Sequence, residues 1–222
     1  GTRTGLNEEF VVSPRLDDLQ CVFGCMQGFL SAEESESVPV LAVFNNEEVG
    51  SGTRQGADST FLADVLRRIN AAMGRNEEEY LTAVANSFLV SADNAHAVHP
   101  AHPEYADANE APVMNGGIVM KYNASQKYTT DAVSAAVFRQ ICEEEGVTLQ
   151  RYSNRADLPG GSTLGNISTA HVSVHSVDIG LPQLSMHSAC EVAGARDIED
   201  LVKVMTSYYS RSFSDGAEGI KI

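Results

Sequence analysis

The sequence contains no tryptophan, only four cysteines, and few basic residues for its length. Its 222 residues carry 15 Lys and Arg against 30 Asp and Glu, a formal net charge of −15. Nucleic acids and anionic membranes bind basic surfaces, so this charge argues against both as partners. Four cysteines are too few to indicate a secreted disulfide scaffold.

Long apolar runs are also missing. No stretch of 18 apolar residues could form a membrane span, and the first residues contain no apolar signal-peptide segment. We therefore expect a cytoplasmic protein. The chain has no initiator methionine, which suggests a processed or trimmed polypeptide. Its length suits one large α/β domain or two small ones.

Apolar runs rich in β-branched residues alternate with helical patterns along the chain. Strands are predicted at residues 10–12, 38–44, 87–91, 117–122, 149–153 and 172–179. Helices are predicted at residues 15–30, 59–73, 77–85, 130–145 and 197–213. Residues 97–116, and the glycine-rich residues 160–166, are predicted loops. The alternation predicts one α/β domain, a three-layer α/β/α sandwich with a mostly parallel sheet.

Four predicted strands are followed by residues of the types that bind metals. These residues are Asp17 and Asp18, Glu47 and Glu48, Asp93, and His187. In open α/β sheets functional groups gather beyond the carboxyl ends of strands, so these side chains could meet in one crevice. Packed carboxylates repel each other and need a cation, and a mixed carboxylate and imidazole set suits Zn²⁺, Mn²⁺ or Co²⁺. One of the two adjacent glutamates could then bind metal while the other acts as a general base. An acidic loop at the surface is the ordinary alternative, and the pattern alone leaves both open.

At these positions the chain resembles the aspartyl aminopeptidase family of dinuclear metallo-aminopeptidases. The matching segments occur in family order: SPRLDDL (13–19), FNNEEVGS (44–51), SADNAHAVHP (91–100), GGSTLG (160–165) and DIGLPQLSMHS (178–188). The resemblance implies a phosphorylase/hydrolase-like catalytic domain with two divalent metal ions. Zinc is the favoured metal, with Mn or Co as alternatives. It also implies an enzyme that removes N-terminal residues from peptides.

By resemblance, Asp17 bridges the two metals, and Glu48 and His187 bind one of them. Asp93 binds the other, and Glu47 is the general base. The family's second metal also takes a histidine upstream of the bridging aspartate, and the first histidine here is His96. The dimerisation domain that the family inserts before that aspartate is absent too. We therefore expect residues 1–222 to be an N-terminally incomplete catalytic domain that binds at most one metal well and is inactive, or nearly inactive, alone. The full-length family member is expected to be a homo-oligomer.

The resemblance also suggests which residues contact the substrate. Lys121 matches a lysine that meets the substrate carboxylate in family members preferring acidic residues, and Tyr128 and His96 match residues of the same pocket. Gly161 would let the backbone approach the substrate. These matches favour removal of N-terminal Asp or Glu. A surface lysine, a tight glycine turn, and a preference for neutral residues such as Leu are the alternatives. Bound cations and Lys121 would make the crevice locally positive despite the negative net charge.

The histidine, cysteine and glycine patterns elsewhere in the sequence give weaker indications of function. His96, His99 and His102 resemble a zinc cluster, but Pro100 and Pro103 would break a helix aligning them. Cys21 and Cys25 share a helix face and are expected to be core residues. A nucleotide-binding domain is disfavoured because no strand is followed by GxGxxG or a P-loop lysine. A non-catalytic fragment that acts through assembly remains the second functional hypothesis.

Overall fold

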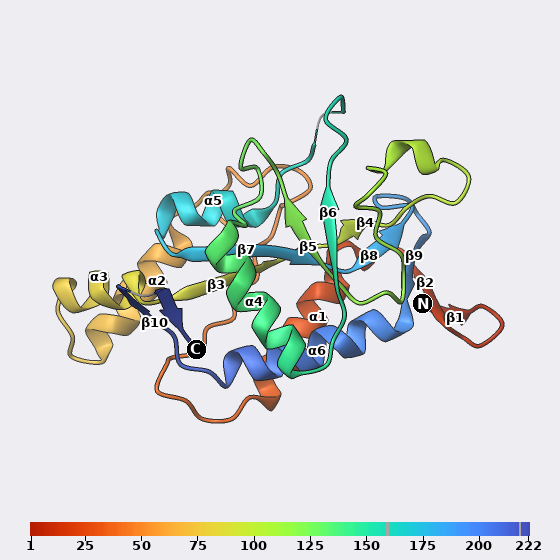
Figure 1. The fold of residues 1–222 in the computed structure, drawn as a ribbon. Helices are drawn as coiled ribbons and strands as arrows, with labels where there is room; N and C mark the ends of the chain where they lie inside the picture. Colours follow the sequence, from red (N-terminus) through yellow and green to blue (C-terminus); the bar gives the residue numbers. More distant parts are fainter. Residues whose placement is uncertain (159, 218) are drawn as a thin grey trace.

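The computed structural model describes residues 1–158, 160–217 and 219–222, and it is an α/β fold (Figure 1). The helices are α1 (Leu16–Ser31), α2 (Phe61–Ala72), α3 (Glu77–Ala85), α4 (Ala132–Glu144), α5 (Leu164–His171) and α6 (Ala195–Tyr209), with a short 3-10 helix at Pro103–Tyr105. The strands are β1 (Thr2–Thr4), β2 (Phe10–Ser13), β3 (Phe88–Ala92), β4 (Ala95–His96), β5 (Ile118–Tyr122), β6 (Leu149–Ser153), β7 (His175–Gly180), β8 (Pro182–Leu184), β9 (Glu191–Gly194), β10 (Ser214–Gly216) and β11 (Gly219–Lys221). No helix in these described ranges is long and apolar enough to cross a lipid bilayer.

The strands form mixed sheets. The central sheet has the order β3-β7-β5-β6, in which β3 and β7 are parallel, β5 and β6 are parallel, and β5 and β7 are antiparallel. A second sheet, β1-β2-β9-β8-β4, is antiparallel except for its β4–β8 pair. The α/β class is thus confirmed, and two of the three strand pairs of the central sheet are parallel, but the sheets are mixed and not purely parallel. The α4 crossover makes β5 and β6 parallel, whereas β7 runs with β3 and therefore against β5.

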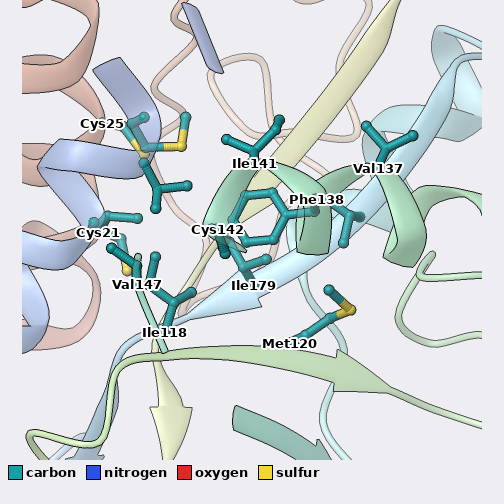
Figure 2. Packing of buried hydrophobic residues seen from close by; sticks show 14 of the residues in the cluster. Cys21, Cys25, Ile118, Met120, Val137, Phe138, Ile141, Cys142, Val147 and Ile179 are labelled. Carbon is teal, nitrogen blue, oxygen red and sulfur yellow. The ribbon is translucent and has the colours of Figure 1, made fainter. Parts of the chain in front are cut away.

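Strand periodicity separates an apolar face of the central sheet from a polar one. Ile118 and Met120 of β5 and Ile179 of β7 join the core formed with α1, α4 and α6. Figure 2 shows Phe138 of α4 lying close to these sheet residues. The alternate residues of β5, Val119 and Lys121, face the side that α5 covers, because successive side chains point to opposite faces. Lys121 therefore lies on the face opposite the core, whereas Arg151 of β6, which lies beside Met120 in the strand register, is on the core face of the sheet.

Helices α1 and α6 pack unusually closely. A Cβ added to Gly24 would lie 2.6 Å from Cδ2 of Leu201, and one added to Gly28 would lie 2.6 Å from Cβ of Met205. Two glycines one helical turn apart therefore allow α6 to lie directly against α1. Since α1 begins at the Asp17 segment, this contact also holds part of the candidate site.

The clearest difference from the sequence prediction concerns residues 38–44. They were expected to be a buried strand, but the structure leaves them without strand pairing and largely exposed. They border a cavity of about 790 Å³ that β3 also lines. Apolar composition alone does not make a strand, because a strand needs a hydrogen-bonded neighbour. Among the described strands, β3 is paired only with β7, and its other edge lies at the end of the sheet.

A smaller correction concerns the glycine-rich segment. Residues 160–166 were expected to be a loop, but α5 already begins at Leu164. Other boundaries agree with expectation to within a few residues. For α3 the agreement is complete, because Asn76 and Glu79 form a capping box at its start.

Candidate metal centre

Three side chains from distant parts of the sequence meet at one point. Nε2 of His187 lies 3.1 Å from Oδ2 of Asp17 and 3.0 Å from Oε1 of Glu48. One ligand atom from each of the three lies within 4.8 Å of the others. The Asp17 side chain is only 5% exposed, while those of His187 and Glu48 are 61% and 51% exposed. The cluster therefore has a buried base and an open side.

A second group of carboxylates shares Asp17. Oxygen atoms of Asp17, Asp18 and Asp93 also lie within 4.8 Å of one another. The sequence places Asp18 beyond a strand end and assigns it no role. Its Oδ1 accepts a hydrogen bond of 3.1 Å from the backbone N–H of Asn94, which draws the Asp18 and Asp93 segments together. The adjacent Asp-Asp pair was the only sequence signal for it.

The electrostatics of the cluster are those of crowded, partly buried acids. Burial, followed by the charge of Asp93, raises the pKa of Asp17 to about 8, although Lys121 acts in the opposite direction. Burial and Asp93 also raise the pKa of Asp18 well above its usual range. The pKa of Glu47 is raised by burial and by the charges of Asp93 and Glu48. These shifts arise first from burial of the carboxylates and then from the like charges around them, and both effects disfavour the ionised form.

The residues present fit a divalent cation. Oδ1 of Asp17 is buried and has no hydrogen-bond partner among the described residues. Buried polar atoms are normally paired, so an oxygen left without a partner beside an imidazole and a second carboxylate is a suitable cation ligand. The mixture of nitrogen and oxygen donors is the set expected for zinc or manganese.

Lys121 is buried beside this cluster and is not a surface lysine. Its Nζ donates a 2.7 Å hydrogen bond to the backbone carbonyl of Asn94 and lies 3.4 Å from Oδ2 of Asp93. Burial acts to lower the pKa of Lys121, but Asp93 and other neighbours outweigh it and hold the pKa above its usual value. The ammonium group therefore stays charged and offsets part of the negative charge.

The other residues expected at a substrate pocket surround Lys121. Nζ of Lys121 lies 5.6 Å from the centre of the Tyr128 ring. The Tyr152 ring lies 6.4 Å from both the Tyr128 and His96 rings and links them. Gly161 is different, because a Cβ added there would meet no atom within 4 Å. The glycine is therefore not required by packing.

The remaining patterns have structural explanations. Cys21 and Cys25 are buried in the core, as expected. His102 pairs with Glu104 at 3.0 Å, and within the described residues the histidines of this loop form no group with metal-ligand spacing.

The chain is similar to a known family of metal-dependent peptidases. Residues 1–209 match the family model described as aminopeptidase I zinc metalloprotease (M18). The chain belongs to the M18 aminopeptidase family. It is 45% identical over 210 residues to a probable M18 family aminopeptidase 2 of Clostridium acetobutylicum, and this covers 95% of the chain and 48% of the relative. A Pseudomonas aeruginosa protein of the same description is 42% identical over 208 residues, covering 94% of the chain and 47% of the relative.

Solved M18 structures have the same fold. An M18 aminopeptidase from Thermotoga maritima superposes with a TM-score of 0.85 at 26% identity, covering 93% of this chain and 47% of that one. A dodecameric mApe1 from S. cerevisiae superposes with a TM-score of 0.82 at 28% identity, and the match covers 95% of this chain and 48% of that one. The chain thus spans about half the length of the relatives it matches.

Proposed function

We propose that the chain forms the metal-binding part of an aminopeptidase that removes N-terminal residues from peptides. The observation that carries the proposal is the meeting of Asp17, Glu48 and His187, together with a buried Asp17 oxygen that has no hydrogen-bond partner in the described part of the chain. Membership of a zinc metalloprotease family supports the same chemistry.

In this proposal Asp17, Glu48 and His187 hold one divalent ion, and Asp17 and Asp93 contribute to a second. Such ions supply Lewis acidity toward a peptide carbonyl and lower the pKa of water. Glu47 lies next to the ligand Glu48 and is the proposed general base. Its raised pKa suits a carboxylate that takes up a proton and returns it to the leaving amine. The acidic residues around the site also suit the positive N-terminal amine of a peptide, which would account for exopeptidase action.

The role of Glu47 is separable from metal binding. Glu47→Gln should leave zinc affinity within about twofold and lower kcat by about 10²–10⁴-fold, the usual range for a general base. The measurement pairs a zinc titration with peptide turnover in any form of the enzyme that is active. Unchanged turnover would exclude Glu47 as the base.

We further propose a preference for N-terminal Asp or Glu. The support is a charged lysine beside the candidate site, with Tyr128 and His96 around it. A substrate carboxylate would interact with the Lys121 ammonium group and replace part of the interaction between Lys121 and Asp93. A Leu side chain would gain no such interaction, so discrimination would depend on this ammonium group.

The metal site is tested by zinc titration of the chain. His187→Ala should weaken zinc binding by at least about 100-fold, since the only nitrogen ligand of the set is lost. His187 is mostly exposed, so the variant should fold. His175→Ala is the matched control, because His175 also pairs with an aspartate, Asp215 at 3.3 Å, and lies at the start of β7 opposite Phe88, the end of β3 that is far from Asp93. Equal affinity in wild type and His187→Ala would overturn the proposal.

Specificity is tested by binding of Asp-Ala and Leu-Ala dipeptides, which requires no turnover. Lys121→Ala should weaken Asp-Ala binding by at least about tenfold, as expected for loss of a charge-assisted contact, with little effect on Leu-Ala. Lys203→Ala is the control, because Lys203 of α6 is an exposed lysine that also bonds a backbone carbonyl, that of Glu145. Equal losses for both dipeptides would favour neutral substrates.

Assembly is the other part of the proposal. The dodecameric state of the similar yeast protein suggests that the full-length protein is a homo-oligomer. We propose a cytoplasmic location on the strength of the sequence. If the chain binds no metal and yet alters assembly of a longer form of the protein, the non-catalytic alternative is favoured.

A further inference from the structure

Glu191 is a buried carboxylate that joins the two segments carrying the metal-site residues. It is 1% exposed and begins β9. Its Oε2 accepts the backbone N–H of Asp17 at 2.9 Å, and its Oε1 accepts the backbone N–H of His187 at 2.7 Å. One side chain therefore holds the main chains of two proposed ligands.

Regular secondary structure does not hold these two residues. Asp17 interrupts the first turn of α1 with φ −81° and ψ 112°, so its N–H is not directed as in a helix. His187 lies outside any strand and has a left-handed φ of 66°, a region that non-glycine residues rarely adopt. Each therefore depends on a side chain for a hydrogen-bond partner, and Glu191 provides it.

The sheet places Glu191 where it can reach both. In the antiparallel pair of β2 and β9, Glu191 lies opposite Ser13, just before the Asp17 turn. His187 is four residues before Glu191 in the loop that leads into β9. The strand register thus brings the carboxylate between the two ligand segments.

We propose that Glu191 is a positioning residue that holds Asp17 and His187 in the arrangement a metal ion requires. The inference rests on the proposed function of the site. The two carboxylate oxygens of Glu191 accept the backbone N–H groups of Asp17 and His187. With their main chains held in this way, the side chains of Asp17 and His187 point toward the same position. Partners outside the ligand set that orient ligands typically change metal affinity by about 10–100-fold when mutated.

The same fold contains a matched control. Asp197 of α6 is also 1% exposed and also accepts two backbone N–H groups, those of Asn115 at 2.6 Å and Gly117 at 2.9 Å. Neither of those residues belongs to the site. Each of the substitutions Asp197→Asn and Glu191→Gln replaces one acceptor oxygen of a buried carboxylate with an amide nitrogen. The two substitutions differ in where that carboxylate lies, since Asp197 bonds residues outside the site and Glu191 bonds two proposed ligands.

The first measurement is zinc affinity of the 222-residue chain. Glu191→Gln should weaken zinc binding by about 10–100-fold, and Asp197→Asn should leave it within about twofold. Glu191→Asp keeps the charge but is one methylene shorter, so it cannot span both N–H groups and should also weaken binding. Equal effects of the Glu191 and Asp197 variants, or wild-type affinity in Glu191→Gln, would overturn the proposal.

The second measurement is amide hydrogen exchange without metal. Exchange at Asp17 and His187 should become faster in Glu191→Gln, while Asp197→Asn should affect Asn115 and Gly117 instead. If wild type binds no zinc, the proposed metal site fails, and the exchange data still decide whether Glu191 holds these segments. If neither Glu191 variant folds while Asp197→Asn does, the role of Glu191 is in folding and the positioning proposal fails.

Discussion

The packing of α1 on α6 predicts that Gly28→Ala destabilises the protein although alanine is the better helix former. In an exposed helix interior, replacing glycine by alanine stabilises by about 1 kcal/mol. At Gly28 the new Cβ would lie 2.8 Å from the backbone carbon of Met205 and 2.9 Å from the backbone nitrogen of Thr206. Backbone cannot rotate out of the way, so the helices must separate.

The size of the effect follows from that contact. Restoring an ordinary separation of about 3.4 Å from Cβ of Met205, which would lie at 2.6 Å, requires a shift of about 0.8 Å between two helices of the core. Overpacking costs about 1–3 kcal/mol, and we expect the upper part of that range, about 2–3 kcal/mol, because the atoms in the way cannot rotate aside. After the helix-propensity gain, we expect a net loss of about 1–2 kcal/mol. For a chain of this size, that corresponds to a Tm lower by about 2–8 °C.

Gly24→Ala is the matched control within the same helix pair. Its Cβ would meet the end of the Leu201 side chain, which can change rotamer. The loss should be small, with a net change of about 0–1 kcal/mol in either direction. Thermal and urea unfolding of both variants test the difference. A Gly28→Ala protein as stable as wild type, or more stable than Gly24→Ala, would refute the packing argument.

Three further predictions concern the site. Zinc titration of this chain should saturate at about one tight equivalent, because the imidazole-containing set suits zinc better than three carboxylates; two tight equivalents with rapid peptide turnover would contradict this. Burial, and then Lys121 and His187, lower the pKa of His96, so protonation favours the unfolded chain. The contribution of His96 to the free energy of unfolding should therefore increase with pH up to about 6.5 and then remain constant. In urea titrations across this range, the difference between wild type and His96→Gln should show that increase, and a flat difference would exclude it. Gly161→Ala should leave Tm unchanged, since its Cβ meets open space, but should weaken dipeptide binding if the backbone approaches the substrate; unchanged binding would remove Gly161 from the pocket.

Local sequence was sufficient to predict most of the individual elements. The boundaries of α3 follow from Asn76 and Glu79, whose reciprocal hydrogen bonds depend only on nearby residues. Strand β5 follows from its own run of apolar residues, Ile118, Val119 and Met120. The resemblance also identified Asp17, Glu48 and His187 as candidate ligands, since the motifs around them are contiguous in sequence.

Only the tertiary structure showed what depends on distant partners. Residues 38–44 have the composition of a strand, but strand formation depends on a neighbour that local sequence does not specify. The pairing of Lys121 with Asp93 and the position of Asp18 depend on how separate strands end beside one another. Glu191 had no sequence signal, because its two partners are backbone N–H groups, and one of them lies 174 positions away. The sequence by itself determined the α-helices other than α5, the strands β2, β3, β5, β6 and β7, and the candidate ligands. The tertiary structure decided where they meet, because long-range hydrogen bonds and burial depend on which segments the fold places side by side.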